Sequence, residues 1–96
     1  MGPLSSSHET ADAQVTTVPT RLYGVVIGVT AANVDNKIEL KNGTTSGDVL
    51  LTIDIGHQSV GPVVVNLPAE SYIRFDSKMY LDVHGAVDAV TLMYQI

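Results

Sequence analysis

Short runs of alternating apolar and polar residues, separated by turn signals, fill the chain from residue 21 to Ile96. This alternation has the period of two that is typical of a β-strand with one buried face. Turn signals recur about every 8–12 residues, and no segment carries a helical period. The pattern predicts an all-β fold, a small antiparallel β-sandwich or jelly-roll-like barrel of about seven to eight short strands.

The alternation also predicts which side chains face the core. The clearest run is Lys37–Lys41, where apolar and charged residues alternate. Asn42-Gly43 follows directly and is the strongest hairpin signal, because both residues tolerate positive φ, although the loop could extend through Asp48. The predicted core-face residues are Tyr23, Val25, Ile27, Val29, Ile38, Leu40, Val49, Leu51, Ile53, Ile55, Ile73, Phe75, Met79, Leu81, Val83, Val90, Leu92, Tyr94 and Ile96.

The first 20 residues form a polar leader without a single Lys or Arg. Neither strand nor helix periodicity persists in it, which is typical of a disordered tail, or of an extended arm that is ordered only against a partner. We favour the arm and divide the chain into an extended N-terminal arm (1–20) and a β-sandwich domain (21–96). Val15 and Val18 are among the few sizeable apolar groups of the leader, and we expect them to contact a partner.

The size of the domain favours oligomerisation. A domain this short buries only about 60–65% of the surface that its unfolded chain exposes, so its stability is marginal without further support. The chain has no cysteine for disulfides and no motif that resembles a zinc site. Charged residues are 16% of the chain and hydrophobic residues 45%, which predicts apolar surface that a partner covers. We expect a homo-oligomer and favour a trimer.

Charge argues against several classes of partner. The formal net charge is −5, and the five basic residues are scattered singly. Binding to nucleic acid or to an anionic membrane needs clustered Lys and Arg, so neither is expected. No apolar run approaches the length of a membrane span, and the N-terminus lacks the charge and apolar order of a signal peptide. Synthesis in the cytoplasm is the expectation.

No set of residues with recognisable catalytic spacing is present. His57 lies in a loop near Asp54, and His84 lies beside Asp82 on an outward strand face, where a surface neighbour is the simplest interpretation. The segment Asn33–Asn36 has oxygen ligands for calcium but lacks the rest of an EF-hand loop, so turn chemistry explains it better. We predict no enzyme activity, no catalytic residue, no cofactor and no metal ligand.

Two tyrosines are predicted to point away from the core. Tyr72 and Tyr80 are placed outward by the alternation, where they suit either a subunit contact or a platform for a sugar or base. We favour the contact. The predicted partner-contact residues are therefore Val15, Val18, Tyr72 and Tyr80.

The order of motifs along residues 21–96 supports a family resemblance. Four segments carry it: Ile38–Ile53 with its Asn-Gly turn, Gly61–Pro68 with its Leu-Pro end, Ile73–Val83 with Ile-Arg-Phe and Tyr-Leu-Asp-Val, and the terminal run Val90–Tyr94. In this order they resemble the small β-sandwich virion proteins that are encoded among the structural genes of tailed bacteriophages. The leader has no counterpart in the resemblance. At residues 69–72 the chain has Ala-Glu-Ser-Tyr where such proteins have a Gly.

The resemblance implies a non-enzymatic structural role. Such proteins decorate or cement capsids, or form parts of fibres and necks, and the resemblance brings no catalytic residue. The expected function is a capsid decoration or cement protein that stabilises a phage head through subunit contacts and its arm. The alternative is a fibre, neck or tail component that binds a carbohydrate or host-surface ligand. The expected partners are the major capsid protein or other virion proteins, and the expected location is the virion.

Overall fold

The computed structural model describes residues 5–29, 36–56, 61–68, 70–85 and 87–96. These ranges contain β-strands and no helix, so they also contain no helix that could span a membrane. The predicted all-β class is confirmed. The strands are β1 (Ser5–Glu9), β2 (Ala13–Gln14), β3 (Thr20–Val29), β4 (Asn36–Asn42), β5 (Asp48–Gly56), β6 (Gly61–Asn66), β7 (Ile73–Phe75), β8 (Met79–His84) and β9 (Val87–Gln95).

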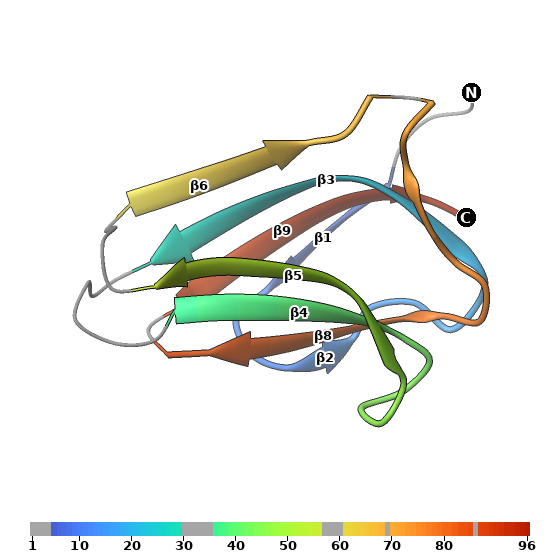
Figure 1. The fold of residues 1–96 in the computed structure, drawn as a ribbon, viewed down its shortest axis with the longest axis horizontal. Coiled ribbons are helices and arrows are strands. Elements are labelled where there is room, and N and C mark those ends of the chain that lie inside the picture. The colour runs from blue at the N-terminus through green and yellow to red at the C-terminus, as the bar shows by residue number, and fades with distance from the viewer. Residues whose placement is uncertain (1–4, 30–35, 57–60, 69, 86) are drawn as a thin grey trace.

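The strands form two antiparallel sheets that pack face to face (Figure 1). One sheet has the order β1-β9-β3-β6, with β7 also paired to β3, and the other has the order β2-β8-β4-β5. β6 pairs with residues 24–29 of β3, and β7 pairs with residues 20–22 on the same strand. If β6 and β7 are taken as one interrupted strand, eight strands follow the order of a jelly roll, the double-sheet arrangement built from two Greek keys.

The polar leader contributes the first strand of each sheet. β1 pairs with β9, where Ser5 lies opposite Tyr94 and Glu9 opposite Val90. β2 pairs with β8, and the chain continues past it with the Val15 amide donating to the Met79 carbonyl at 2.9 Å. The described part of the leader is thus extended, and within one chain it lies along its own body.

The core lies between the two sheets and consists largely of the predicted side chains. Its buried members are Leu22, Val25, Ile27, Val29, Ile38, Leu40, Phe75, Met79, Leu81, Val87, Val90 and Leu92. Leu51, Ile53, Ile55, Ile73, Val83 and Tyr94 are half-buried against them. Leu22 and Tyr23 are both buried although they are neighbours in sequence, because a register shift in the β3–β9 ladder interrupts the alternation between Leu22 and Gly24.

Two predicted core residues are exposed instead. Val49 is 44% exposed, because Leu40 lies opposite Leu51 while the next residue, Lys41, lies opposite Val49. The extra residue, Leu50, makes a β-bulge that turns Val49 out of the inward set. Ile96 is 72% exposed because it follows the end of β9, where no strand lies opposite it. The alternation predicted both side chains wrongly.

The loop between β4 and β5 runs from Gly43 to Gly47. It is longer than a two-residue turn, and among the described residues only Gly43 and Gly85 have positive φ, with Gly43 at 122°. The loop is tied to the β7–β8 turn, because the Gly43 amide donates to the Lys78 carbonyl at 2.8 Å and the Ser77 amide donates to Asn42 Oδ1 at 2.9 Å. These two bonds fix the start of the β4–β5 loop against the β7–β8 turn.

Candidate functional site

The two leader residues predicted as contacts differ in their surroundings. Val15 is half-buried and packs against the core of its own chain. Val18 is exposed in the turn between β2 and β3. Of the two, Val18 therefore has the side chain that a neighbouring molecule can reach, and its contact with a partner stays a prediction.

The two outward tyrosines belong to different sheets and do not form a pair. Tyr80 lies on β8, opposite Gln14, and is half-buried. Tyr72 directly precedes β7, and its ring centroid is 5.5 Å from that of Tyr23. The Arg21 guanidinium lies over the Tyr72 ring, 5.3 Å from its centroid. Because Arg21 and Tyr23 already contact this ring, Tyr72 offers little free aromatic face for stacking on a ligand.

The strands that carry large apolar side chains exposed to solvent are β5 and β6. Val49 and Leu50 of β5 are 44% and 41% exposed, and Val64 of β6 is 56% exposed. Both strands are edges: β6 closes one sheet beyond β3, and β5 closes the other beyond β4 (Figure 1). Leu50 and Val64 were not predicted as contact residues, because the pattern of apolar residues does not show which strands lie at the edges.

β6 has only part of the usual protection of an edge strand. Natural proteins keep edge strands from pairing with other chains by means of charged side chains, Pro or bulges. The strand reads Gly-Pro-Val-Val-Val-Asn and contains no charged residue. Pro62 removes one backbone donor near its start, and the backbone from Val63 to Asn66 has no such block. This uncharged edge is a surface on which another strand can add.

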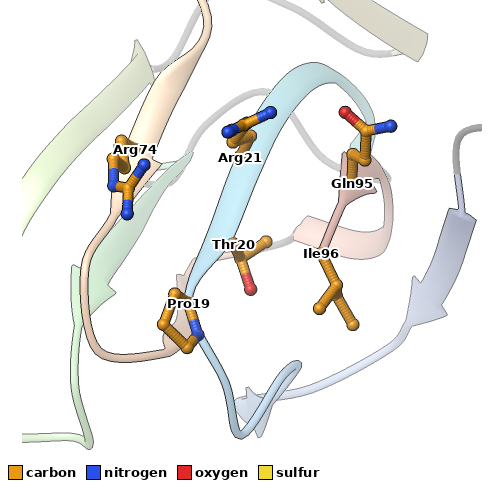
Figure 2. A pocket seen from close by; sticks show the side chains of 6 residues that line it. All are labelled: Pro19, Thr20, Arg21, Arg74, Gln95 and Ile96. Atoms are coloured by element: carbon orange, nitrogen blue, oxygen red, sulfur yellow. The ribbon is translucent and has the colours of Figure 1, made fainter. Parts of the chain in front are cut away.

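A small pocket lies where β3, β7 and the end of β9 meet. It has a volume of about 160 Å³ and is lined by Pro19, Thr20, Arg21, Arg74, Gln95 and Ile96. Figure 2 shows Arg21 between Arg74 and Gln95, in agreement with the strand register. The Arg74 Nε donates to Asp76 Oδ1 at 2.7 Å. Ligand pockets usually have about 300–1,000 Å³, so this pocket is too small to enclose a drug-sized substrate.

A polar cluster lies on the outer face of the four-stranded sheet. His84 Nε2 of β8 lies 3.2 Å from Glu39 Oε1 of β4 and 3.4 Å from Asp82 Oδ1. Lys41 Nζ lies 3.1 Å from Asp82 Oδ2 and donates to the Thr45 carbonyl at 2.9 Å. The sequence placed Asp82 and His84 on one outward face. The sequence did not predict that Glu39 lies beside them, because β4 and β8, which pair here, are about 40 residues apart in the chain.

The other residues considered for chemistry lie outside the described residues or apart from this cluster. His57 and residues 33–35 of the calcium alternative lie outside the described residues. His8 is exposed on β1, with Nδ1 3.1 Å from the Thr91 hydroxyl, in the sheet opposite to that of His84. In the described part of the chain, Glu39, Asp82 and His84 are the one group of three or more His, Cys, Asp or Glu side chains that lie close enough to share a ligand.

No protein-family model matches the chain, and no curated protein sequence matches it. The resemblance of residues 21–96 to phage virion proteins therefore stays a prediction.

Proposed function

We propose that the protein is a non-enzymatic structural protein of a phage particle, of the capsid decoration or cement type. The observation that carries this proposal is the pair of edge strands, β5 and β6, which present large apolar side chains to solvent. A protein that acts as a monomer usually protects its edge strands from pairing with other chains. An assembly protein uses them as contacts.

The fold supports the same conclusion. Jelly rolls occur widely in viral capsids, although they also occur in lectins and cupins, so the architecture is an argument by analogy. The pocket between β3, β7 and the end of β9 has only about 160 Å³, and neighbours from the same chain contact the aromatic ring of Tyr72. These features favour contact between proteins over capture of a carbohydrate. They give no specific support to the fibre or tail alternative.

A cement protein acts through many copies. Each contact with the particle can be weak, because repeated contacts across capsomer boundaries raise the total affinity by effective concentration. In this proposal the edge strands join copies of the chain or join it to the capsid protein. The exposed Val18 turn of the leader supplies a further contact.

The test is binding to particles of the parent phage that were prepared without this protein. We expect the purified chain to sediment with the particles until a fixed number of copies per particle is bound, and to raise the temperature at which the particles rupture. Val64→Lys should lower occupancy, because it places a charge on the β6 edge, whereas Ser6→Lys on β1 at the other end of the same sheet should not. A chain that remains in the supernatant at all concentrations would overturn the proposal.

A further inference from the structure

We propose that Glu39, Asp82 and His84 form a binding site for a divalent transition-metal ion, with Zn²⁺ as the best fit. The three side chains come from the two central strands of the four-stranded sheet, β4 and β8. Glu39 lies directly opposite Asp82 in the ladder, and His84 follows Asp82 by two residues, on the same face. All three residues lie within strands and are half-buried, so the sheet rather than a loop holds their backbone in place.

The distances fit a tetrahedral ion. Zn–N and Zn–O bonds measure about 2.0–2.2 Å, so two ligands of one tetrahedral centre lie about 3.3–3.6 Å apart. His84 Nε2 is 3.2 Å from Glu39 Oε1 and 3.4 Å from Asp82 Oδ1. The ligand atoms of all three residues lie within 4.8 Å of one another. An ion can therefore sit between them with small side-chain movements and no change in strand register.

Lys41 orients Asp82 without occupying the site. Its ammonium bonds Oδ2 of Asp82, while Oδ1 faces His84, and the Thr45 carbonyl holds the ammonium on its other side. An outer partner of this kind fixes a ligating carboxylate and leaves one oxygen for the metal. With neutral His84, the two carboxylates and the ammonium leave one formal negative charge to attract a cation.

The hydrogen bonds within the cluster leave room for an ion. A proton on Nε2 of His84 can serve only one of the two carboxylate oxygens well, although both oxygens lie within 3.4 Å of Nε2, and in the other neutral tautomer Nε2 is a free metal ligand. A metal ion in place of that proton bonds both oxygens and Nε2 together. Water would complete a tetrahedral shell as the fourth ligand.

The ligand types select among metals. Imidazole with two carboxylates suits Zn²⁺ and other late first-row metals, whereas Ca²⁺ takes six to eight oxygen ligands and Mg²⁺ near-ideal octahedral oxygen geometry. No metal ligand was predicted from the sequence, because His84 and Asp82 are surface neighbours on one strand and make only two ligands. The strand pairing adds the third ligand.

The experiment is isothermal titration of the full chain with ZnCl₂ and, separately, with MgCl₂. We expect one Zn²⁺ per chain, no binding of Mg²⁺, and a shift of the His84 imidazole signals in NMR spectra on Zn²⁺ addition. His84→Ala and Glu39→Gln should each raise the Kd by about ten-fold or more. The matched controls are His8→Ala and Glu70→Gln, which change the same residue types at exposed positions outside the cluster.

Several results would overturn the site. They are the absence of Zn²⁺ binding at millimolar concentration, the same Kd in His84→Ala as in the unchanged chain, and the same loss of affinity in His8→Ala. Circular dichroism in EDTA should show that each variant keeps the fold, because the three ligands lie on the outer face of the sheet and not in the core. Zn²⁺ should also raise the melting temperature of the unchanged chain and not that of His84→Ala.

Discussion

The buried hydroxyls of Thr16 and Thr20 connect the leader to β8. The Met79 amide donates to Thr16 Oγ1 at 3.0 Å, the two hydroxyl oxygens lie 2.7 Å apart, and Thr20 Oγ1 donates to the Val18 carbonyl at 2.8 Å. If Thr16 donates to Thr20, every donor in this series has an acceptor. The series satisfies polar groups that the sandwich removes from water.

Replacing Thr16 with Val should lower the free energy of unfolding by about 1–3 kcal/mol, because the Met79 amide loses its acceptor in a buried place. Val has nearly the same shape, so the loss reports the hydroxyl rather than a cavity. The measurement is urea unfolding followed by circular dichroism. Thr17→Val is the control, since Thr17 is exposed and should change stability by less than about 0.5 kcal/mol. Equal stability of the two variants would contradict the hydrogen-bond series.

Gly47 lies close to the backbone of Asn42, at the other end of the β4–β5 loop, and the space between them excludes a side chain. A Cβ atom at this position would overlap the Asn42 carbonyl oxygen and would lie 2.8 Å from the carbonyl carbon. Gly47→Ala should therefore destabilise the fold by more than about 1 kcal/mol, because backbone atoms cannot move aside as a flexible side chain can. Thr45→Ala in the same loop is the matched control, since the Thr45 side chain is exposed. Thermal melting of both variants checks this, and a Gly47→Ala melting temperature equal to that of the control would contradict the loop geometry.

At the scale of elements, the leader's strands belong to both sheets. β1 covers the edge of β9, and β2 covers the edge of β8. Between β2 and β3, Val15 packs on the core and Thr16 bonds Met79. The leader thus contacts both sheets. The free energy of unfolding should therefore fall in two steps, first when β1 is removed and again when β2 and the residues after it are removed.

A chain that begins at residue 11 loses only β1 and should stay folded with lower stability. A chain that begins at residue 21 also loses Val15, worth about 1–2 kcal/mol by its apolar burial, and several hydrogen bonds of about 1 kcal/mol each. Small domains have about 5–15 kcal/mol in total. The second truncation should therefore lie close to unfolding. Urea midpoints of the three lengths measure this, and equal midpoints would show that the leader does not pair with its own body in solution.

The elements also show what local pattern can and cannot predict. Ile38, Leu40, Met79 and Leu81 were placed in the core by alternation, and they are fully buried. Alternation is local, so it fails where a bulge intervenes, as at Val49. It also does not give strand partners, because pairing joins segments far apart in the chain.

The same limit explains the candidate sites. Asp82 and His84 were assigned to one outward face from sequence, but the approach of Glu39 depends on the β4–β8 register. The polar, aperiodic leader left a disordered tail and an extended arm as alternatives, and the pairing of its strands with β9 and β8 required the structure. The sequence thus predicts which polar residues share a face of one strand, but it does not predict a site that two strands form together.

For the whole molecule, acidic charge and apolar edges oppose each other. The net charge of −5 repels copies of the chain from one another, whereas Val49, Leu50 and Val64 on β5 and β6 favour their association. Salt screens exposed charges and leaves apolar association intact or stronger. The balance between monomer and oligomer should therefore depend on ionic strength.

We expect light scattering after size exclusion to show a closed oligomer, a trimer in our proposal, whose fraction grows as NaCl is raised. Val64→Lys should shift the chain to monomer at every salt concentration, because a Lys in the β6 edge costs desolvation when another strand adds there. Ser6→Lys carries the same change in charge at the β1 edge and should leave the oligomer intact, which separates a local effect at β6 from an effect of net charge. If both variants dissociate the oligomer equally, charge alone controls it. If the unchanged chain is a monomer at all salt concentrations, the edges serve a different partner, and contact between copies is wrong.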